Sequence, residues 1–309
     1  MASPLIEQYL DLKSQHPDKV LFFRLGDFYE MFFDDAIEVS SVLNLVLTKR
    51  KNKVDGQIPM CGIPYHSSEG YLEKLIQKGY QVAIAEQVEK AKPGKDLVRR
   101  EVVKVVTQAT ILLESSTDSI QTDTHVASIT SRNKESYIAI LSTITGRITL
   151  TKASNSDINE VLRRFNVHEV IGKISEQEHT WKVVSPPPYI SKKTSKNLEK
   201  LAQKLKVFSL DVYNVPRGTL FEKPLSGLIW YLESIHAEKK ISISEIVYDI
   251  PENLLVIDEQ TRKNLEIFPY EGKRTSLWDI LHQTKTAMGS RLLQHWMSSP
   301  TKDQKTLQE

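Results

Sequence analysis

The sequence predicts an α/β protein with more than one domain. Its 309 residues are enough for about two ordinary domains. Its composition is 40% apolar and 26% charged, without long low-complexity tracts, which is typical of a globular protein. Strand-like runs alternate with helical patterns over residues 1–110, and this alternation indicates an α/β arrangement.

The chain begins with a predicted helix and a predicted strand. The helix is expected over residues 3–17, because Ser3 can cap it and Pro17 lies beyond its end. The β-branched and aromatic run KVLFFRL then predicts a strand. A second strand is predicted by VLNLVLT, and a basic loop, KRKNKVDG, follows it.

Between these two strands, the stretch GDFYEMFFDDA allows two positions for the side chain of Phe28, in the core or on the surface. Asp27 and Glu30 have the spacing of a capping box, which would begin a helix at Asp27. Phe28 would then extend the apolar stripe of that helix into the core. The stripe consists of Phe32, Ala36, Val39 and Leu43. The alternative is that Phe28 points out of the protein.

Turn-forming residues divide the rest of the first domain. IPMCGIPYH is rich in Pro and Gly and predicts a shaped loop. A helix is expected to begin at Ser67 and to end at Gly79, which can adopt the left-handed conformation of a C-terminal cap. YQVAIAEQ and EVVKVVT predict two further strands.

A polar segment over residues 114–123 predicts a linker to a second domain. SYIAILSTITGRITLT predicts two strands around a turn at Thr145–Gly146. DINEVLRRF and SKNLEKLAQKL predict helices, and this second α/β domain ends near residue 235. From Ile243 onward the patterns are mostly helical.

The sequence does not support a catalytic or metal site. The surroundings of its Gly-Lys pairs do not fit the phosphate loop G-x-x-x-x-G-K-[ST]. Cys61 is the single cysteine and the eight histidines are scattered, so we expect no metal. Apolar runs are shorter than the ~20 residues of a membrane span, and a signal peptide is not evident, so we expect a cytoplasmic protein.

Two basic segments are candidates for contact with nucleic acid. One is Lys49–Lys53, and the other covers residues 90–104 with six basic and two acidic side chains. If both face one groove, they would bind phosphates and release counterions. Otherwise they are solvated surface.

Several motifs follow one another along almost the whole chain, and they are FFRLGDFYEMFFDDA, LNLVLTKR, IPMCGIPYH, YQVAIAEQV, VVKVVT, VPRG, DEQTRKNLEI and TAMGSRLLQHWM. In sequence and in order, these motifs resemble bacterial MutS, a family of DNA mismatch recognition proteins. The resemblance implies a mixed-sheet mismatch-binding domain over 1–112, a connector domain with a ribonuclease-H-like fold over 124–235, and the beginning of an all-helical core domain over 240–309. The sequence departs from the family pattern at Thr107–Thr110, where it reads TQAT instead of T-P-G-T. The loss of Pro and Gly should loosen a turn.

The resemblance also implies roles for individual residues. The ring of Phe28 would enter the minor groove and stack on a mispaired base, and Glu30 would hydrogen-bond to the displaced base. Tyr29 is expected to pack within its own domain. Candidates for contact with the DNA backbone come from two further motifs, and they are Lys49, Arg50, Lys51, Pro64, Tyr65 and His66.

The partners implied by the resemblance are duplex DNA with mismatches or small loops, in the bacterial nucleoid, and MutL, which would dock on the connector domain. Full-length relatives are dimers that bind ATP and Mg. This chain is expected to lack their clamp, ATPase and main dimer contacts, and so to bind no cofactor and catalyse no reaction. An alternative function is a protein-interaction fragment that docks MutL and has negligible affinity for DNA. A nuclease is disfavoured, because the central strand pair lacks carboxylates for metals.

Overall fold

The computed structural model comprises two compact units. It describes residues 3–52, 56–89, 98–110, 124–173, 182–184, 193–215, 217–235, 241–249, 255, 257, 259–269, 275–305 and 307–308. The first unit contains residues 1–111 and 232–239, and the second contains 112–231 and 240–309.

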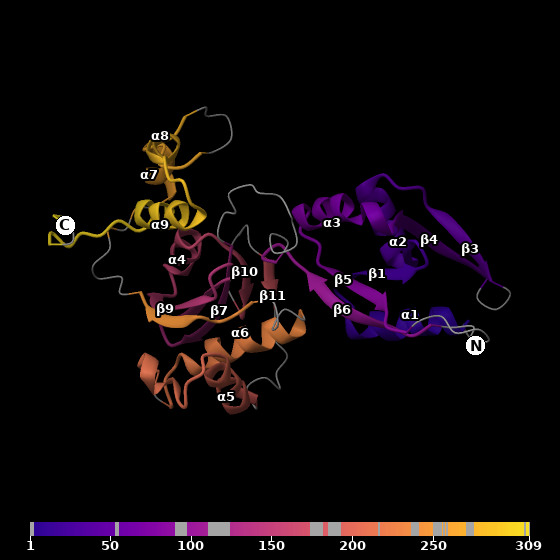
Figure 1. Cartoon of the computed structure of the whole chain (residues 1–309), viewed down its shortest axis with the longest axis horizontal. Coiled ribbons are helices and arrows are strands. Elements are labelled where there is room, and N and C mark those ends of the chain that lie inside the picture. Colours follow the sequence, from indigo (N-terminus) through magenta and orange to yellow (C-terminus); the bar gives the residue numbers. More distant parts are fainter. Residues whose placement is uncertain are drawn as a thin grey trace. The chain divides into compact units, whose positions relative to one another are not determined.

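A six-stranded mixed sheet forms the centre of the first unit, in the order β3-β4-β2-β1-β5-β6 (Figure 1). β1 and β5 are parallel, and the other neighbours are antiparallel. The strands are β1 (Val20–Leu25), β2 (Phe28–Phe32), β3 (Thr48–Asn52), β4 (Gly56–Pro64), β5 (Val82–Gln87) and β6 (Arg100–Val106).

Helices cover both faces of this sheet. Figure 1 shows α2 (Phe33–Leu43) and α3 (Ser68–Gln77) on one side, and α1 (Pro4–Gln15) on the other. A short 3₁₀ helix, η1 (Tyr65–Ser67), leads into α3. The core between the sheet and α2 and α3 includes Tyr29, Met31, Cys61, Leu75 and Ile84, all of which are buried. The predicted first helix, the strand KVLFFRL, the Ser67 cap position, the positive φ of Gly79 and the last two strands are confirmed.

The prediction that a helix begins at Asp27 is wrong. Residues 28–32 form the strand β2, and α2 begins only at Phe33. β2 pairs with β1 on one side and with β4 on the other, so two hydrogen-bonded ladders replace the helical bonds that the capping box suggested. Phe33 makes the transition from strand to helix with a φ of 54°, a value that a bulky side chain rarely adopts.

Three further predictions between residues 42 and 66 are wrong. VLNLVLT is the end of α2 and a connection rather than a strand. Residues 49–52 of the basic run that follows it belong to the strand β3, and residues 53–55 lie outside the described residues. IPMCGIPYH lies mostly in the nine-residue strand β4. The prolines of β4 are compatible with a strand because Pro64 is its last residue, and because Pro59 lies beyond Met60, where the pairing of β4 with β2 ends.

The turn at Thr107–Thr110 is closed by hydrogen bonds, although Pro and Gly are missing there. The amide of Thr107 donates to Oγ1 of Thr110 over 3.0 Å, and the amide of Thr110 donates to the carbonyl oxygen of Thr107 over 3.1 Å. Both threonines are buried. The two threonines thus bond to each other across the turn. The predicted linker at 114–123 lies outside the described residues.

The second unit has its own six-stranded mixed sheet, in the order β11-β10-β7-β8-β9-β12. β7, β8 and β9 form an antiparallel meander, while β10, β11 and β12 join by parallel pairing. The strands are β7 (His125–Arg132), β8 (Glu135–Ser142), β9 (Arg147–Ser154), β10 (Val167–Ile171), β11 (Lys182–Val184) and β12 (Glu245–Tyr248). The predicted turn at Thr145–Gly146 is confirmed.

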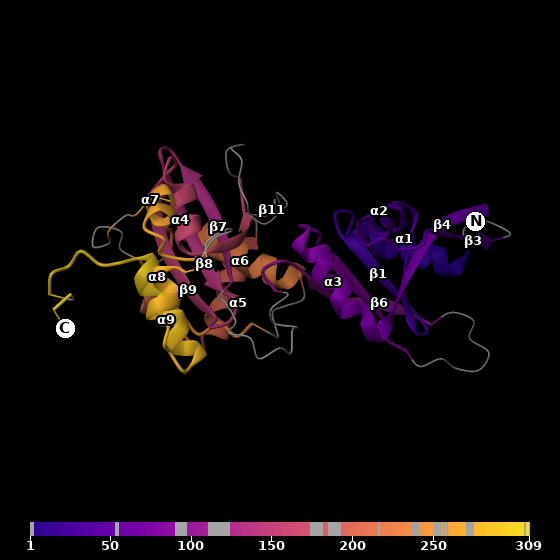
Figure 2. The same ribbon diagram turned by 90° about the horizontal axis from the view of Figure 1, so that it is seen from above.

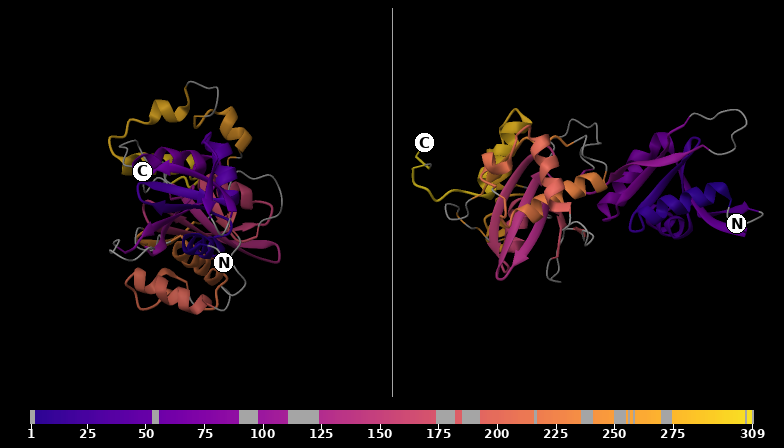
Figure 3. Two further views of the ribbon diagram at one scale, coloured as in Figure 1. Left: turned by 90° about the vertical axis from the view of Figure 1, so that its right-hand side faces the viewer. Right: turned by 90° about the horizontal axis from the view of Figure 1, so that it is seen from below.

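Helices lie on both faces of this sheet as well. α4 (Ile158–Arg164) packs on the face of Ala127 and Ile129, and the view from above shows α7 (Glu259–Asn264), α8 (Leu277–Leu281) and α9 (Ala287–Ser298) on this side (Figure 2). α5 (Thr194–Lys204) and α6 (Glu222–Ser234) lie on the opposite side, where the view from below shows α6 in front of the strands (Figure 3). A 3₁₀ helix, η4 (Leu210–Tyr213), follows α5.

The region from residue 240 is not wholly helical as predicted. β12 adds to the edge of the second sheet beside β9, and Arg147 of β9 forms an ion pair with Glu245 over 2.7 Å. The predicted helices over LLVIDEQTRKNLEI and TAMGSRLLQHWM are present as α7 and α9 where the chain is described. Among the described residues, none of the helices is long and apolar enough to span a bilayer.

Candidate functional site

Phe28 is a surface residue at the start of β2. The turn Gly26–Asp27 connects β1 to β2, with Gly26 in the left-handed region at a φ of 56°. The amide of Tyr65 donates to the carbonyl oxygen of Asp27 over 2.8 Å, which fixes this turn against the end of β4. The ring of Phe28 nevertheless remains 48% exposed. A large aromatic side chain held on a strand but left in water is a candidate contact for a partner.

The alternation of β2 separates this side chain from the core. Tyr29 and Met31 point into the core beneath α2 and α3, so Phe28, Glu30 and Phe32 share the other face. At the end of this row, Phe32 is buried against Tyr9 of α1, with ring centroids 5.0 Å apart. Glu30 therefore lies between a buried aromatic ring and an exposed one.

Glu30 has cationic neighbours on both sides of its strand. One Nη of Arg50, on β3, lies 3.4 Å from Oε2 of Glu30, and Arg100, on β6, interacts with the same carboxylate. Burial raises the pKa of Glu30, while the charges of Arg50 and Arg100 oppose that shift. The carboxylate is thus partly removed from water and balanced by arginines, rather than bonded to a helix N-terminus.

The residue opposite Glu30 on β4 is Gly62. A Cβ built at Gly62 would lie 3.7 Å from Cγ of Glu30 and 4.0 Å from Cδ1 of Phe28, which is ordinary contact distance. A side chain at this position would therefore cover part of both residues. Glycine leaves them accessible from this direction.

A second cluster supports the turn from the opposite face. The guanidinium of Arg24 stacks on the ring of Tyr65, 3.4 Å from its centroid, and its Nε donates to the carbonyl oxygen of Gly26. Tyr29 donates its hydroxyl to Glu86, and its pKa is raised, first by burial and then by this bond. Tyr29 packs within its own unit, as predicted.

Two family models match parts of this chain. MutS domain I matches residues 3–116, which include the whole Phe28–Glu30 region, and MutS domain III matches residues 260–309. DNA mismatch repair protein MutS of Thermotoga neapolitana is 34% identical over 311 residues, which cover 99% of this chain and 38% of the relative. The proteins of the same name from Geobacillus sp. WCH70 and Wolbachia pipientis wMel are each 36% identical, and the matches cover 36% and 37% of their lengths.

By sequence, the chain belongs to the MutS family. It matches the N-terminal region, and it spans between 36% and 38% of the length of these curated relatives. The exposed Phe28 and the arginine-paired Glu30 thus lie in MutS domain I. Among the described residues, His, Cys, Asp and Glu form no group of three or more that could hold a metal.

The other candidate residues of this MutS domain do not form one surface. Lys49 and Arg50 are neighbours on β3 and so point to opposite faces, and only Arg50 shares the face of Glu30. Tyr65 and His66 are exposed at the end of β4, and Pro64 pairs with Phe28 across the ladder. The side chain of Lys51 lies outside the described part of the structure.

In its described residues, 98–104, the second basic segment does not provide the row of phosphate contacts that a shared groove would need. Residues 90–97 lie outside the described residues. Arg99 pairs with Glu101 over 2.5 Å. Arg100 is buried, donates to the carbonyl oxygen of Arg24 over 2.6 Å and stacks on Phe23. Arg100 is therefore a structural residue of the MutS domain that also faces Glu30.

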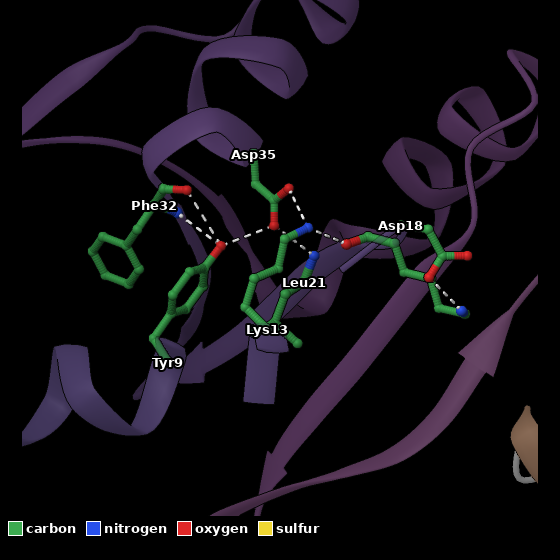
Figure 4. Close-up of polar contacts among 7 residues, drawn as sticks. Tyr9, Lys13, Asp18, Leu21, Phe32 and Asp35 are labelled. Atoms are coloured by element: carbon green, nitrogen blue, oxygen red, sulfur yellow. Dashed lines mark hydrogen bonds and ion pairs between the residues drawn. The ribbon is translucent and has the colours of Figure 1, made fainter. Parts of the chain in front are cut away.

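Sequence reasoning missed a polar network that holds the end of β2. The hydroxyl of Tyr9 donates to Oδ2 of the buried Asp35 over 2.9 Å and lies 3.3 Å from the carbonyl oxygen of Phe32 (Figure 4). Lys13 pairs with Oδ1 of Asp35 over 2.8 Å, and the amide of Leu21 donates to Oδ2 over 3.0 Å. An acidic residue near a helix start normally suggests a solvated cap, so no local pattern indicated that Asp35 is buried.

Proposed function

We propose that this chain recognises mismatched or unpaired bases in duplex DNA. Phe28 enters the minor groove and stacks on the mispaired base, and Glu30 probes the displaced base. The observation that carries this proposal is the exposed ring of Phe28 beside a half-buried, arginine-paired Glu30, within residues that match MutS domain I. The names of the relatives, DNA mismatch repair protein MutS, support it.

The mechanism follows from the mechanics of DNA. Inserting an apolar wedge unstacks a base step, which costs a few kcal/mol, and the cost is least where pairing is already defective. Selection then depends on the deformability of the duplex rather than on a base code, so one wedge can accept many mismatches.

Glu30 weakens binding to DNA, whereas the ring of Phe28 strengthens it. A carboxylate near phosphates is repelled by their charge, and it recovers this energy only where a displaced base offers a hydrogen bond. At a correctly paired site that partner is absent. Glu30 therefore increases discrimination and lowers the affinity for every duplex.

The second unit would act as the connector domain of this family, with a ribonuclease-H-like fold, and would dock MutL. ATP, Mg and the dimer would belong to the full-length protein, which would act on chromosomal DNA in the bacterial cytoplasm. A protein-docking fragment with negligible DNA affinity is the alternative function. Phe208, which is fully exposed, and Val212 on η4, which is 70% exposed, favour this alternative, because exposed apolar side chains often mark protein contacts.

The test is the binding of a G·T duplex and of its G·C counterpart at low and moderate salt. We expect the native chain to prefer the G·T duplex. Phe28→Ala should lose roughly tenfold in affinity for G·T and most of that preference, since stacking one base on an aromatic ring contributes about 1–3 kcal/mol.

The matched control is Phe208→Ala, which removes an exposed ring from the second unit. It should leave both affinities unchanged. Equal binding of both duplexes by the native chain and by Phe28→Ala would reject the proposed function and favour the protein-docking alternative.

A further inference from the structure

The ion pair between Arg50 and Glu30 joins two strands that are not neighbours in the sheet. β3, which carries Arg50, is the edge strand of its sheet, and β4 lies between it and β2. The pair therefore spans one intervening strand. Arg50 is opposite Ile58 on β4, whereas Glu30 is opposite Gly62, so the arginine reaches diagonally along β4 to the carboxylate. Its guanidinium lies 6.0 Å from the ring centroid of Phe32, and Gly62 places no side chain beside Glu30.

The other cation that faces Glu30 is already engaged. Arg100 donates from Nε to the carbonyl oxygen of Arg24, and from Nη1 to Gln8 and to the carbonyl oxygen of Val98 over 3.1 and 2.7 Å. Its guanidinium also lies 4.8 Å from the ring centroid of Phe23, the residue that pairs with Glu30 on β1. These contacts fix Arg100 within the sheet, whereas Arg50 is 38% exposed and lies at the open side of the site.

The two partners differ in their access to water. The Glu30 side chain is 19% exposed, against 38% for Arg50. A carboxylate that loses most of its hydration is destabilised in its charged form unless a cation or a donor compensates it. Arg50 supplies that compensation from the far side of β4, and its planar guanidinium also restricts the directions in which the carboxylate can turn.

We infer that Arg50 is the positioning residue for Glu30: it holds the Glu30 carboxylate, ionised and oriented, on the open face beside Phe28. This inference rests on the proposed function, because the held carboxylate is the group that probes the base. Arg50 thereby sets how well the site distinguishes a mismatch, beyond any contact that it makes with a phosphate.

The first test needs no DNA. The pKa of Glu30 is measured by NMR of the free 309-residue chain, with glutamate labelled at the carboxyl carbon. Arg50→Met should raise this pKa, since it removes a favourable charge from a carboxyl group whose pKa burial already raises. Arg50→Lys should restore most of the native value.

Lys49→Met is the matched control for this measurement, because it removes a positive charge from the adjacent position on the opposite face of β3. It should leave the pKa of Glu30 nearly unchanged. An unchanged pKa in Arg50→Met, or an equal change in Lys49→Met, would overturn the inference.

The second test uses the ratio of affinities for the G·T and G·C duplexes. Arg50→Met should lower this ratio several-fold in the native background and leave it unchanged in a Glu30→Gln background, because the effect passes through the carboxylate. If Arg50→Met weakens both duplexes equally in both backgrounds, Arg50 is only a phosphate contact and the inference fails. If the native chain does not prefer G·T at all, the proposed function fails, while the pKa measurement still decides whether Arg50 holds Glu30.

Discussion

Asp35, on α2, is a buried carboxylate whose partners come from two other elements. It accepts hydrogen bonds from Tyr9 of α1 and from the amide of Leu21 on β1, and it pairs with Lys13 of α1. Burial and the charge of Asp35 both raise the pKa of the Tyr9 hydroxyl, which therefore stays protonated and remains a donor at neutral pH. A negative charge in this position links α1 and α2 to the same strand.

Replacing Asp35 by Asn should destabilise the first unit. An amide keeps one acceptor but removes the charge that balances Lys13, and hydrogen bonds to charged groups contribute about 1.5–3 kcal/mol each. We expect a loss of about 2 kcal/mol in the free energy of unfolding, measured by urea denaturation.

Asp18→Asn is the control for that measurement. Asp18 also pairs with a lysine, Lys19, over 2.9 Å, but its side chain is largely exposed (Figure 4). Exposed ion pairs contribute little, so the change should be within about 0.5 kcal/mol of zero. Equal losses in the two variants would mean that the Asp35 network does not stabilise the unit.

At the scale of elements, strands and turns were predicted best where the sequence carries a single clear pattern. The apolar run KVLFFRL and the turn at Thr145–Gly146 were predicted correctly, because burial on both faces and the left-handed glycine leave a clear signal. Residues 26–66 were predicted poorly. There the helical spacing of Phe32, Ala36 and Val39 obscured the fact that Phe32 belongs to the preceding strand.

The site itself depends on neighbours that are distant in sequence. Phe28 and Glu30 are identified by resemblance to a family, but Arg50 and Gly62 come beside them only through the ladders of β2, β3 and β4. Strand pairing over such separations is not encoded in a local pattern. The face that Arg50 shares with Glu30 therefore required the structure.

Gly146 shows how tightly one turn is packed. Its φ is 72°, and a Cβ at this position would lie 1.7 Å from the carbonyl oxygen of Ser242 in the segment leading to β12. Gly146→Ala must displace this backbone as well as strain its own. We expect a loss of roughly 3 kcal/mol in the free energy of unfolding, measured in urea.

Gly218→Ala separates these two causes. Gly218 has a similar φ, 87°, but a Cβ there would meet no atom within 4 Å. It should therefore lose only the roughly 1 kcal/mol that a left-handed alanine costs. If both variants lose the same free energy of unfolding, the close approach of Ser242 to Gly146 does not contribute to the loss.

At the scale of the whole molecule, the chain consists of two units with separate sheets and separate cores. Units of this kind often unfold in separate cooperative transitions. We expect two transitions in scanning calorimetry, with Asp35→Asn lowering the midpoint of one and Gly146→Ala lowering the midpoint of the other. A single transition that both variants shift together would show that the units unfold as one.

The position of β2 inside its sheet has a mechanical consequence. A side chain that bends a stiff duplex experiences an equal and opposite force, and bending DNA by tens of degrees costs several kcal/mol. β2 is hydrogen-bonded to β1 and to β4, so under the proposed function both neighbouring strands would share the force on Phe28. The same ring on a flexible loop would be displaced by paired and mispaired DNA alike. On a strand held from both sides, the duplex would deform before the protein does.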